Sequence, residues 1–375
     1  MTTIALERPA TVRTERRAPA FEFVGPNWFA SVMGTGIVAV ALAGLPFPVP
    51  YAGPVAAAVW ALSAVLLVAV VAATVMHHRL YPEVARGHLD DPVMAHFYGA
   101  PAMALMTVGA GAMVAGDRLI GASPALVLDI VLWTVGTLLG LATAVVVPYR
   151  AFTRHDVRAD SAFGGWLMPV VPPMVSATTG ALLVPHLPAG QARETLLVAC
   201  YLFFGLTLVA SSVLITLIWG RLLRHGTGAA AAVPTLWIVL GPLGQSITAV
   251  HHLGLVAPGV LPAPYGTAFQ ALGLVYGVPV WGFAMLWLAL AALITARTAR
   301  AGLPFSLTWW SFTFPVGTVV TGTSGLAAVT GLVVLQVAAG LLFALLVTAW
   351  VTVSVRTVRG VYAGDLLRGP EIRTS

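Results

Sequence analysis

The chain has little charge, a single cysteine and no lysine. Only 9% of its 375 residues are charged and 59% are apolar, whereas an ordinary soluble domain carries about 25% charged residues. Its mean hydropathy of +0.93 is too high for a surface in contact with water. The one cysteine, Cys200, excludes an intrachain disulfide and a cysteine-based metal cluster. The composition therefore argues against a soluble enzyme, a nucleic-acid binder or a disordered protein, and it indicates an all-α polytopic membrane protein.

Ten runs of predominantly apolar residues are long enough to cross a bilayer, which takes about 20 residues in a helix. They lie at 19–44, 54–76, 93–115, 124–147, 162–184, 194–219, 234–254, 267–295, 306–326 and 329–354. The predicted membrane domain therefore covers 19–355. The arginine-rich segment before it, 1–18, is predicted to be a disordered cytoplasmic tail, and 356–375 is predicted to form a second cytoplasmic tail.

The basic residues are distributed unevenly between the predicted loops. All 19 are arginines, and if the ten spans alternate in direction, 17 fall on one side of the membrane. Only Arg118 and Arg193 fall on the other side. Because arginine-rich loops stay in the cytoplasm, both termini are predicted to be cytoplasmic in a plasma or inner cell membrane. The net charge of +6 is therefore explained by the arginines on the cytoplasmic side, and it does not indicate a nucleic-acid partner.

The odd-numbered spans share a proline at nearly constant intervals of 75, 71, 70 and 73 residues. These residues are Pro26, Pro101, Pro172, Pro242 and Pro315. A near-constant period indicates an internal repeat, and the predicted unit is a helical hairpin that occurs five times. Each proline is expected to kink its helix and free a backbone carbonyl, which is costly in lipid. We therefore expect the five odd helices around a central pore and the five even helices facing lipid.

The odd spans carry small and hydroxylated residues close to these prolines, and no Asp, Glu or Arg at depth. The candidates for lining the pore are Thr35, Thr107, Thr178, Gln245, Ser246 and Thr318. Asp129, in an even span, is the main ionisable residue away from the loops. Because charged residues inside membranes usually mark cation or proton paths, this lining argues against a carboxylate-based cation site. It favours anions, with neutral solutes as the alternative.

Histidines are the remaining titratable groups of interest. His96, near the cytoplasmic end of the third span, is the candidate for a titrating group, and the alternative is a solvated interfacial histidine. His251 and His252 lie at the outer end of the seventh span. No histidine has the spacing of a metal site, and the sequence predicts neither a metal nor a cofactor.

The segment LTWWSFTFPVGTVVTG holds two tryptophans and two phenylalanines ahead of Pro315. Trp309 and Trp310 suit the aromatic belt at a membrane interface. Phe312 and Phe314 lie about one turn deeper, and a bulky ring beside a kink in a pore-lining helix can act as a hydrophobic gate. The residues alone leave open whether these rings form a gate or pack against lipid and neighbouring helices.

Four stretches, GPNWFASVMGTGI, HFYGAPAMALMTVG, LGPLGQSI and WWSFTFPVGT, resemble the tellurite-resistance/dicarboxylate transporter family. That family includes fungal malate permeases, fungal sulfite efflux pumps and plant slow anion channels. The resemblance implies a pore of five hairpins that carries small anions, usually in a homotrimer. It also implies that a phenylalanine of the fifth inner helix closes the pore, and the motif places this role on Phe314, with Phe312 as the alternative.

The expected function is a membrane transporter or channel for small anions, with C4-dicarboxylates such as malate first. Sulfite or another inorganic anion is the alternative substrate. A membrane-embedded enzyme is a remote alternative, because the odd spans hold no paired acids and no set of several histidines. The expected partners are the small anion, the lipid bilayer and two further copies of the chain.

Overall fold

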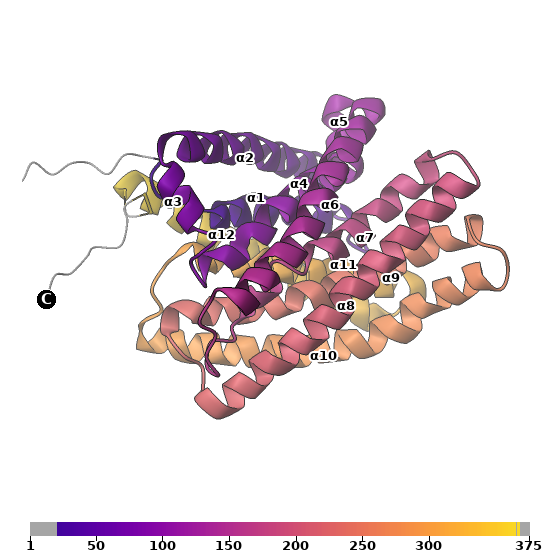
Figure 1. The fold of residues 1–375 in the computed structure, drawn as a ribbon. Coiled ribbons are helices and arrows are strands. Elements are labelled where there is room, and N and C mark those ends of the chain that lie inside the picture. The colour runs from indigo at the N-terminus through magenta and orange to yellow at the C-terminus, as the bar shows by residue number, and fades with distance from the viewer. Residues whose placement is uncertain (1–20, 365, 368–375) are drawn as a thin grey trace, which may run out of the picture.

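The computed structural model describes residues 21–364 and 366–367 of the chain. All regular structure in these residues is helical, as the composition predicts (Figure 1). The predicted tail at 1–18 lies outside the described residues, as does the end of the second predicted tail, 368–375.

Long and short helices alternate along the described chain. The long helices, of 29 to 38 residues, are α2 (Ala52–Leu80), α6 (Ala122–Thr153), α8 (Gln191–His225), α10 (Tyr265–Gly302) and α12 (Val333–Ala363). The short helices, of 12 to 17 residues, are α1 (Phe29–Ala43), α4 (Gly99–Gly111), α7 (Pro172–Leu183), α9 (Leu240–Val256) and α11 (Phe314–Thr330). Smaller elements are α3 (Pro82–Gly87), α5 (Asp117–Ile120) and a π-helix that continues α4 (Ala112–Gly116). The last long helix, α12, continues past the predicted boundary at 355.

Within the described residues, nine helical segments are long and apolar enough to span a membrane. The tenth predicted span, 162–184, is not among them because its helix is interrupted. A 3-10 turn, Gly164–Leu167, ends before α7 begins at Pro172. Proline lacks the N–H that would continue the helix, which explains the break. The segment nevertheless packs against α4, α6, α8 and α9, as the other short helices pack against their neighbours.

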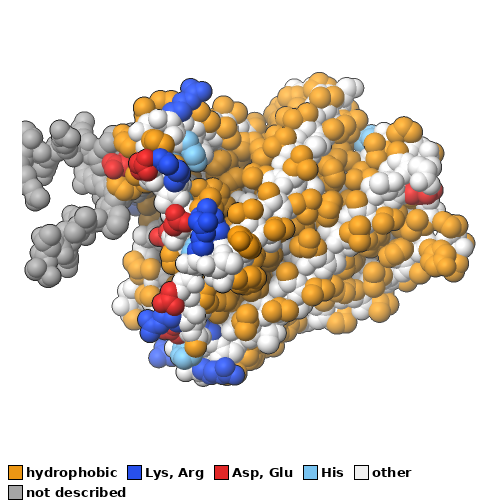
Figure 2. All heavy atoms as spheres, in the orientation of Figure 1, with side chains coloured by type: hydrophobic (Ala, Val, Ile, Leu, Met, Phe, Trp, Pro, Cys, Tyr) orange, Lys and Arg blue, Asp and Glu red, His pale blue; other side chains and the backbone are white. Residues whose placement is uncertain are grey.

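The two kinds of helix differ in what surrounds them. Among the nine spans, the most apolar window is 72% to 83% buried in those that contain a short helix, but only 22% to 33% buried in the long helices. Hydrophobic side chains cover the flank of the molecule, and most charged side chains on the visible face gather at one end (Figure 2). Because such an apolar flank is stable in lipid, the long helices form the lipid-facing layer.

The short helices pack around a common axis and close a ring. Helix α1 contacts α4 and α11, α4 contacts α7, α7 contacts α9, and α9 contacts α11. Each long helix packs against the short helix that precedes it in the chain (Figure 1). The ring is therefore buried behind a second layer made of α2, α6, α8, α10 and α12.

The five periodic prolines lie at the starts of the short α-helices. Pro26 opens a 3-10 turn just before α1, and Pro172 and Pro315 are the first and second residues of α7 and α11. Pro101 and Pro242 are the third residues of α4 and α9. Further 3-10 segments precede α4, α7, α9 and α11, at Met94–Tyr98, Gly164–Leu167, Ala230–Val239 and Leu307–Phe312. Proline is tolerated in a first turn because its missing N–H has no helical partner there. The prolines thus mark changes from 3-10 to α-helix rather than bends in the middle of one helix.

Candidate functional site

The ring of short helices encloses a cavity of about 280 Å³, called the central cavity below. All five short helices contribute to its wall. Phe314, the first residue of α11, borders it at one end, while His251 and His252, near the end of α9, border it at the other. The described residues that line it include no Asp, Glu or Arg. The cavity is therefore walled by the five short helices, and its described lining carries no permanent charge.

The wall of the central cavity is polar on three neighbouring helices, α7, α9 and α11. Their polar lining residues are Thr178, Thr179, Gln245, Thr248, His251, His252, Thr321 and Ser324. Helix α1, by contrast, contributes Ile37 and Val40. An anion in a cavity without cationic side chains needs N–H or O–H donors, so the free donors of this wall decide what the cavity can bind.

The threonine hydroxyls donate their protons to backbone carbonyls of their own helices. Thr107 donates to the Met103 carbonyl at 2.7 Å, and Thr178 donates to the Met174 carbonyl at 2.9 Å. Because a hydroxyl has one proton, these groups offer only acceptor lone pairs and methyl groups to the cavity. They shape the wall but supply no donor to an anion.

Gln245 and Ser324 keep donors available. Each is 5% exposed. Within the described residues, Thr178 donates a hydrogen bond to the main-chain carbonyl of Gln245. The side-chain amide of Gln245 has no hydrogen-bond partner among these residues. The Ser324 hydroxyl is buried without any partner among the described residues. Gln245, Thr248 and His252 follow the spacing i, i+3, i+7, which places them on one face of α9. The Gln245 amide and the Ser324 hydroxyl therefore belong to two neighbouring helices, α9 and α11, that border the cavity.

The two phenylalanines predicted as gates lie in different surroundings. Phe314 is 2% exposed and borders the central cavity. Phe312 belongs to the preceding 3-10 segment and packs edge-on against Trp237 and Trp309, with ring centroids 5.2 and 5.6 Å apart. Of the two rings, only that of Phe314 lines the central cavity.

Three of the six predicted pore-lining residues, Thr107, Thr178 and Gln245, border the central cavity. Thr35 instead accepts a hydrogen bond from the Trp350 indole of α12 at 3.1 Å. Thr318 is fully buried where α11 meets α9, and it donates to the Pro315 carbonyl at 2.7 Å.

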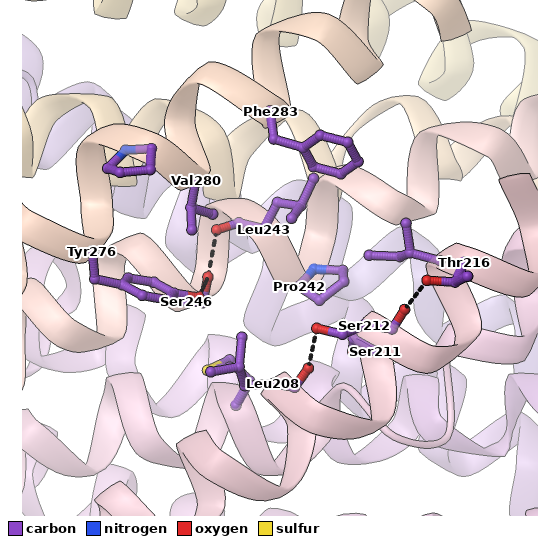
Figure 3. A pocket seen from close by; sticks show the side chains of 13 residues that line it. Leu208, Ser211, Ser212, Thr216, Pro242, Leu243, Ser246, Tyr276, Val280 and Phe283 are labelled. Atoms are coloured by element: carbon purple, nitrogen blue, oxygen red, sulfur yellow. Dashed lines mark hydrogen bonds between the residues drawn. The ribbon is translucent and has the colours of Figure 1, made fainter.

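Ser246, the sixth candidate, borders a second cavity of about 400 Å³ between α8, α9 and α10 (Figure 3). Its hydroxyl accepts a hydrogen bond from the Tyr276 hydroxyl at 2.9 Å and donates to the Leu243 carbonyl at 2.8 Å. Successive residues of a helix point about 100° apart, so Gln245 and Ser246 reach different cavities.

His96 borders a third cavity, of about 720 Å³, together with His155 and Asp156. Its ring stacks on Trp166 at 6.2 Å and meets Phe163 edge-on at 5.7 Å. No described residue lines both this cavity and the central one. His96 therefore borders a different cavity from the one that the short helices surround.

His251 and His252, unlike His96, do border the central cavity. From the sequence they were expected at the outer end of a span and had no predicted role. The seven-residue spacing between Gln245 and His252 is the signal that could have located His252 on the wall. Asp129, the other unusual ionisable residue, is fully buried in α6 against Gly109 and does not border the central cavity.

Membrane-length helices around an enclosed cavity with free donors are the arrangement of a multi-pass transport protein or channel. The chain matches the voltage-dependent anion channel family, SLAC1, over residues 24–358. It belongs to this family, which confirms the resemblance carried by the motifs, and it is an anion transporter or channel.

Two of the similar proteins are named for different anions, sulfite and malic acid. The chain is 28% identical over 340 residues to the sulfite efflux pump SSU1 of Arthroderma otae, covering 89% of each chain. It is 26% identical to an uncharacterized transporter of Methanocaldococcus jannaschii, over 92% of this chain and 95% of the relative. It is 25% identical to the malic acid transport protein of Schizosaccharomyces pombe, over 44% of this chain and 40% of that protein.

Proposed function

We propose that this protein moves small oxyanions across a membrane through the central cavity. The observation that carries the proposal is the wall itself, which presents the free donors of Gln245 and Ser324 and has no carboxylate among its described lining residues. Its volume of about 280 Å³ lies near the lower end of small-molecule sites, which suits a small anion.

Sulfite, in its singly charged hydrogensulfite form, is the first substrate in this proposal, and malate is the second. The cost of moving an ion out of water is high and rises steeply with its charge, so a wall without cationic side chains favours a monoanion. The sulfite efflux pump relative matches over 89% of this chain, whereas the malic acid transport protein matches over 44%. This order reverses the expectation drawn from the sequence.

Phe314 is proposed as the gate of this path. Its ring borders the cavity at the end where α11 begins, which is also the end at which the long helices carry most of their arginines. A ring at this position replaces water with apolar surface and so raises the barrier to an ion. Phe312 is the weaker candidate because its ring is held between two tryptophans.

The proposal includes the larger arrangement expected from the sequence. Five helical hairpins form one pore, three chains form a homotrimer, and both termini face the cytoplasm at the cell membrane. The alternation of short and long helices and the gathering of arginines at one end support it. In this orientation His251 and His252 lie at the outer end of the pore, and the arginines attract anions to the inner end.

Flux of labelled anions into proteoliposomes tests the proposal. Liposomes with the purified protein should take up sulfite faster than protein-free liposomes, and malate should be slower or should compete. Uptake of both anions at the protein-free rate would overturn the proposal. Faster uptake of malate than of sulfite would restore the order expected from the sequence.

A further inference from the structure

We propose that His251 and His252 form an anion-binding site at the outer end of the central cavity, where a small oxyanion binds together with a proton. The inference rests on the proposed function and deepens it. The two rings are neighbours, with centroids 5.6 Å apart, and both border the cavity. Among the described residues that line the cavity, they are the only ionisable ones.

Helix packing aims these imidazoles at the cavity. The ring of His251 lies against Gly325 of α11, where a Cβ atom would come within 2.8 Å of it. Glycine at this position thus leaves room for the ring between α9 and α11. The His252 Nδ1 atom is buried and has no hydrogen-bond partner within the described residues. A buried ring nitrogen without a partner is costly, and a bound oxyanion would supply the missing acceptor for a protonated ring.

A second group at the same place also lacks a partner. Ser324 of α11 is 5% exposed, borders the cavity, and has a hydroxyl with no hydrogen bond in the described part of the chain. The cavity therefore has three kinds of donor: the Gln245 amide and the histidine rings of α9, and the Ser324 hydroxyl of α11. Uncharged hydroxyl and amide groups alone compensate an anion poorly, whereas a histidinium adds the positive charge that the wall otherwise lacks.

In the part of the chain that the structure describes, no other charged side chain borders the cavity beside these rings. Helices α1, α4, α7 and α11 contain no ionisable residue. The ionisable residues on the outer halves of α8 and α10, which also pack against α9, are Arg193, Glu194, Cys200, Tyr201, Tyr265 and Tyr276. None of them borders the central cavity. Arg193 donates to the carbonyls of Leu187 and Pro185, and Tyr276 donates to Ser246. The charge of the cavity therefore depends on His251 and His252.

Because the anion binds together with a proton, the site is expected to fill as the outer solution becomes acidic. The suitable probe is methanesulfonate, because its sulfonate stays ionised throughout this range and any pH dependence then belongs to the protein. We expect the wild-type current carried by methanesulfonate in planar bilayers to be about tenfold larger at about pH 5.5 than at about pH 8.

His252→Gln and the double variant with His251→Gln should lose this pH dependence. The matched control is His186→Gln, which removes another histidine on the same side of the membrane but outside the central cavity, and it should keep the wild-type ratio. A wild-type pH ratio in the double variant would overturn the inference.

A measurement on the unaltered protein guards against a variant that does not fold. Methanesulfonate should raise the thermal unfolding temperature of the detergent-purified wild type more at about pH 5.5 than at about pH 8. Equal shifts at both pH values would count against the site. If sulfite and malate are not transported at any pH, the proposed function fails. If they are transported while the double variant keeps its pH ratio, only this inference fails.

Discussion

The inner and outer helices are both rich in apolar residues, but they differ in length, in the position of proline and in burial. The inner helices are 12 to 17 residues long, carry a proline in or just before their first turn, and are largely buried. The outer helices are continuous and present most of their surface to lipid. Four outer helices donate a tryptophan N–H to the inner layer, from Trp60, Trp133, Trp287 and Trp350 among others. The outer layer therefore supports the fold, and the inner layer, shielded from lipid, can contain irregular backbone and polar groups.

The largest expected effect comes from opening the inner layer at its gate. Phe314→Ala removes the ring that borders the central cavity, so anion current in planar bilayers should rise about tenfold or more, equivalent to about 1.4 kcal/mol or more of barrier. Phe312→Ala is the matched control, because its ring packs on Trp237 and Trp309 outside the cavity. Currents in Phe314→Ala no larger than wild type would count against the gate.

The next effect compares one glycine from each layer. In Gly244→Ala, the new methyl group would overlap the backbone of Thr318 and Val319, so α9 and α11 must separate. We expect a loss of about 1–3 kcal/mol of unfolding free energy. In Gly205→Ala, on the outer helix α8, nothing lies within 4 Å of the added Cβ, and alanine should stabilise the helix by up to about 1 kcal/mol. Thermal unfolding in detergent checks both, and equal shifts would contradict the difference between layers.

A smaller effect tests the hydrogen bonds that join the layers. Trp133 donates to the Ser176 carbonyl at 3.0 Å, so Trp133→Phe should cost about 1 kcal/mol. Trp219→Phe provides the comparison, because that indole is 37% exposed and makes no hydrogen bond within the described residues. The two variants should differ in thermal unfolding temperature. Identical unfolding temperatures would show that the tryptophan hydrogen bonds between outer and inner helices do not stabilise the fold.

The smallest effect concerns the connection between α2 and α4, outside the spans. Burial lowers the pKa of His88, and the charges of His77 and His78 lower it further, while Asp91 acts in the opposite direction. The ring of His88 stacks on that of His77 at 5.0 Å. Because the unfolded chain binds a proton near pH 6.5 and the folded chain resists it, stability should fall as the pH drops below about 6.5.

His88→Gln removes this difference in proton binding. The loss of thermal stability between about pH 7.5 and about pH 5.5 should therefore be smaller in His88→Gln than in the wild type. His225→Gln, at the exposed end of α8, serves as the control. A pH dependence in His88→Gln as steep as that of the wild type would contradict the assignment.

Much of this fold could be predicted from the sequence because the signal for a membrane span is composition and length. Nine of the ten predicted runs coincide with helices of sufficient length. The exception, 162–184, contains Pro172 and Pro173, which lack the N–H groups needed to continue the helix. A hydropathy scale measures only how apolar a residue is, so it does not predict this break. The same limitation led the sequence to predict mid-helix kinks, although the prolines occupy first turns.

The site was harder to predict because small and hydroxylated residues occur on several faces of the inner helices. Their distribution alone does not show which side of α1, α9 or α11 meets the cavity. Thr35 and Thr318 therefore shared the pattern of Thr107 but face neighbouring helices. Gln245, Thr248 and His252 do follow a helical spacing. This spacing identifies the cavity-facing side of α9 only when the packing of the five short helices is known.

The most direct test of the central claim, that the central cavity is the path of the anion, uses the adjacent residues Gln245 and Ser246. In a chain whose only native cysteine is removed by Cys200→Ala, Gln245→Cys faces the central cavity and Ser246→Cys faces the cavity between α8 and α10. An anionic methanethiosulfonate reagent should block the methanesulfonate current in planar bilayers through Gln245→Cys and leave the current through Ser246→Cys unchanged. Block of Ser246→Cys with no effect on Gln245→Cys would contradict the account and place the path outside the ring.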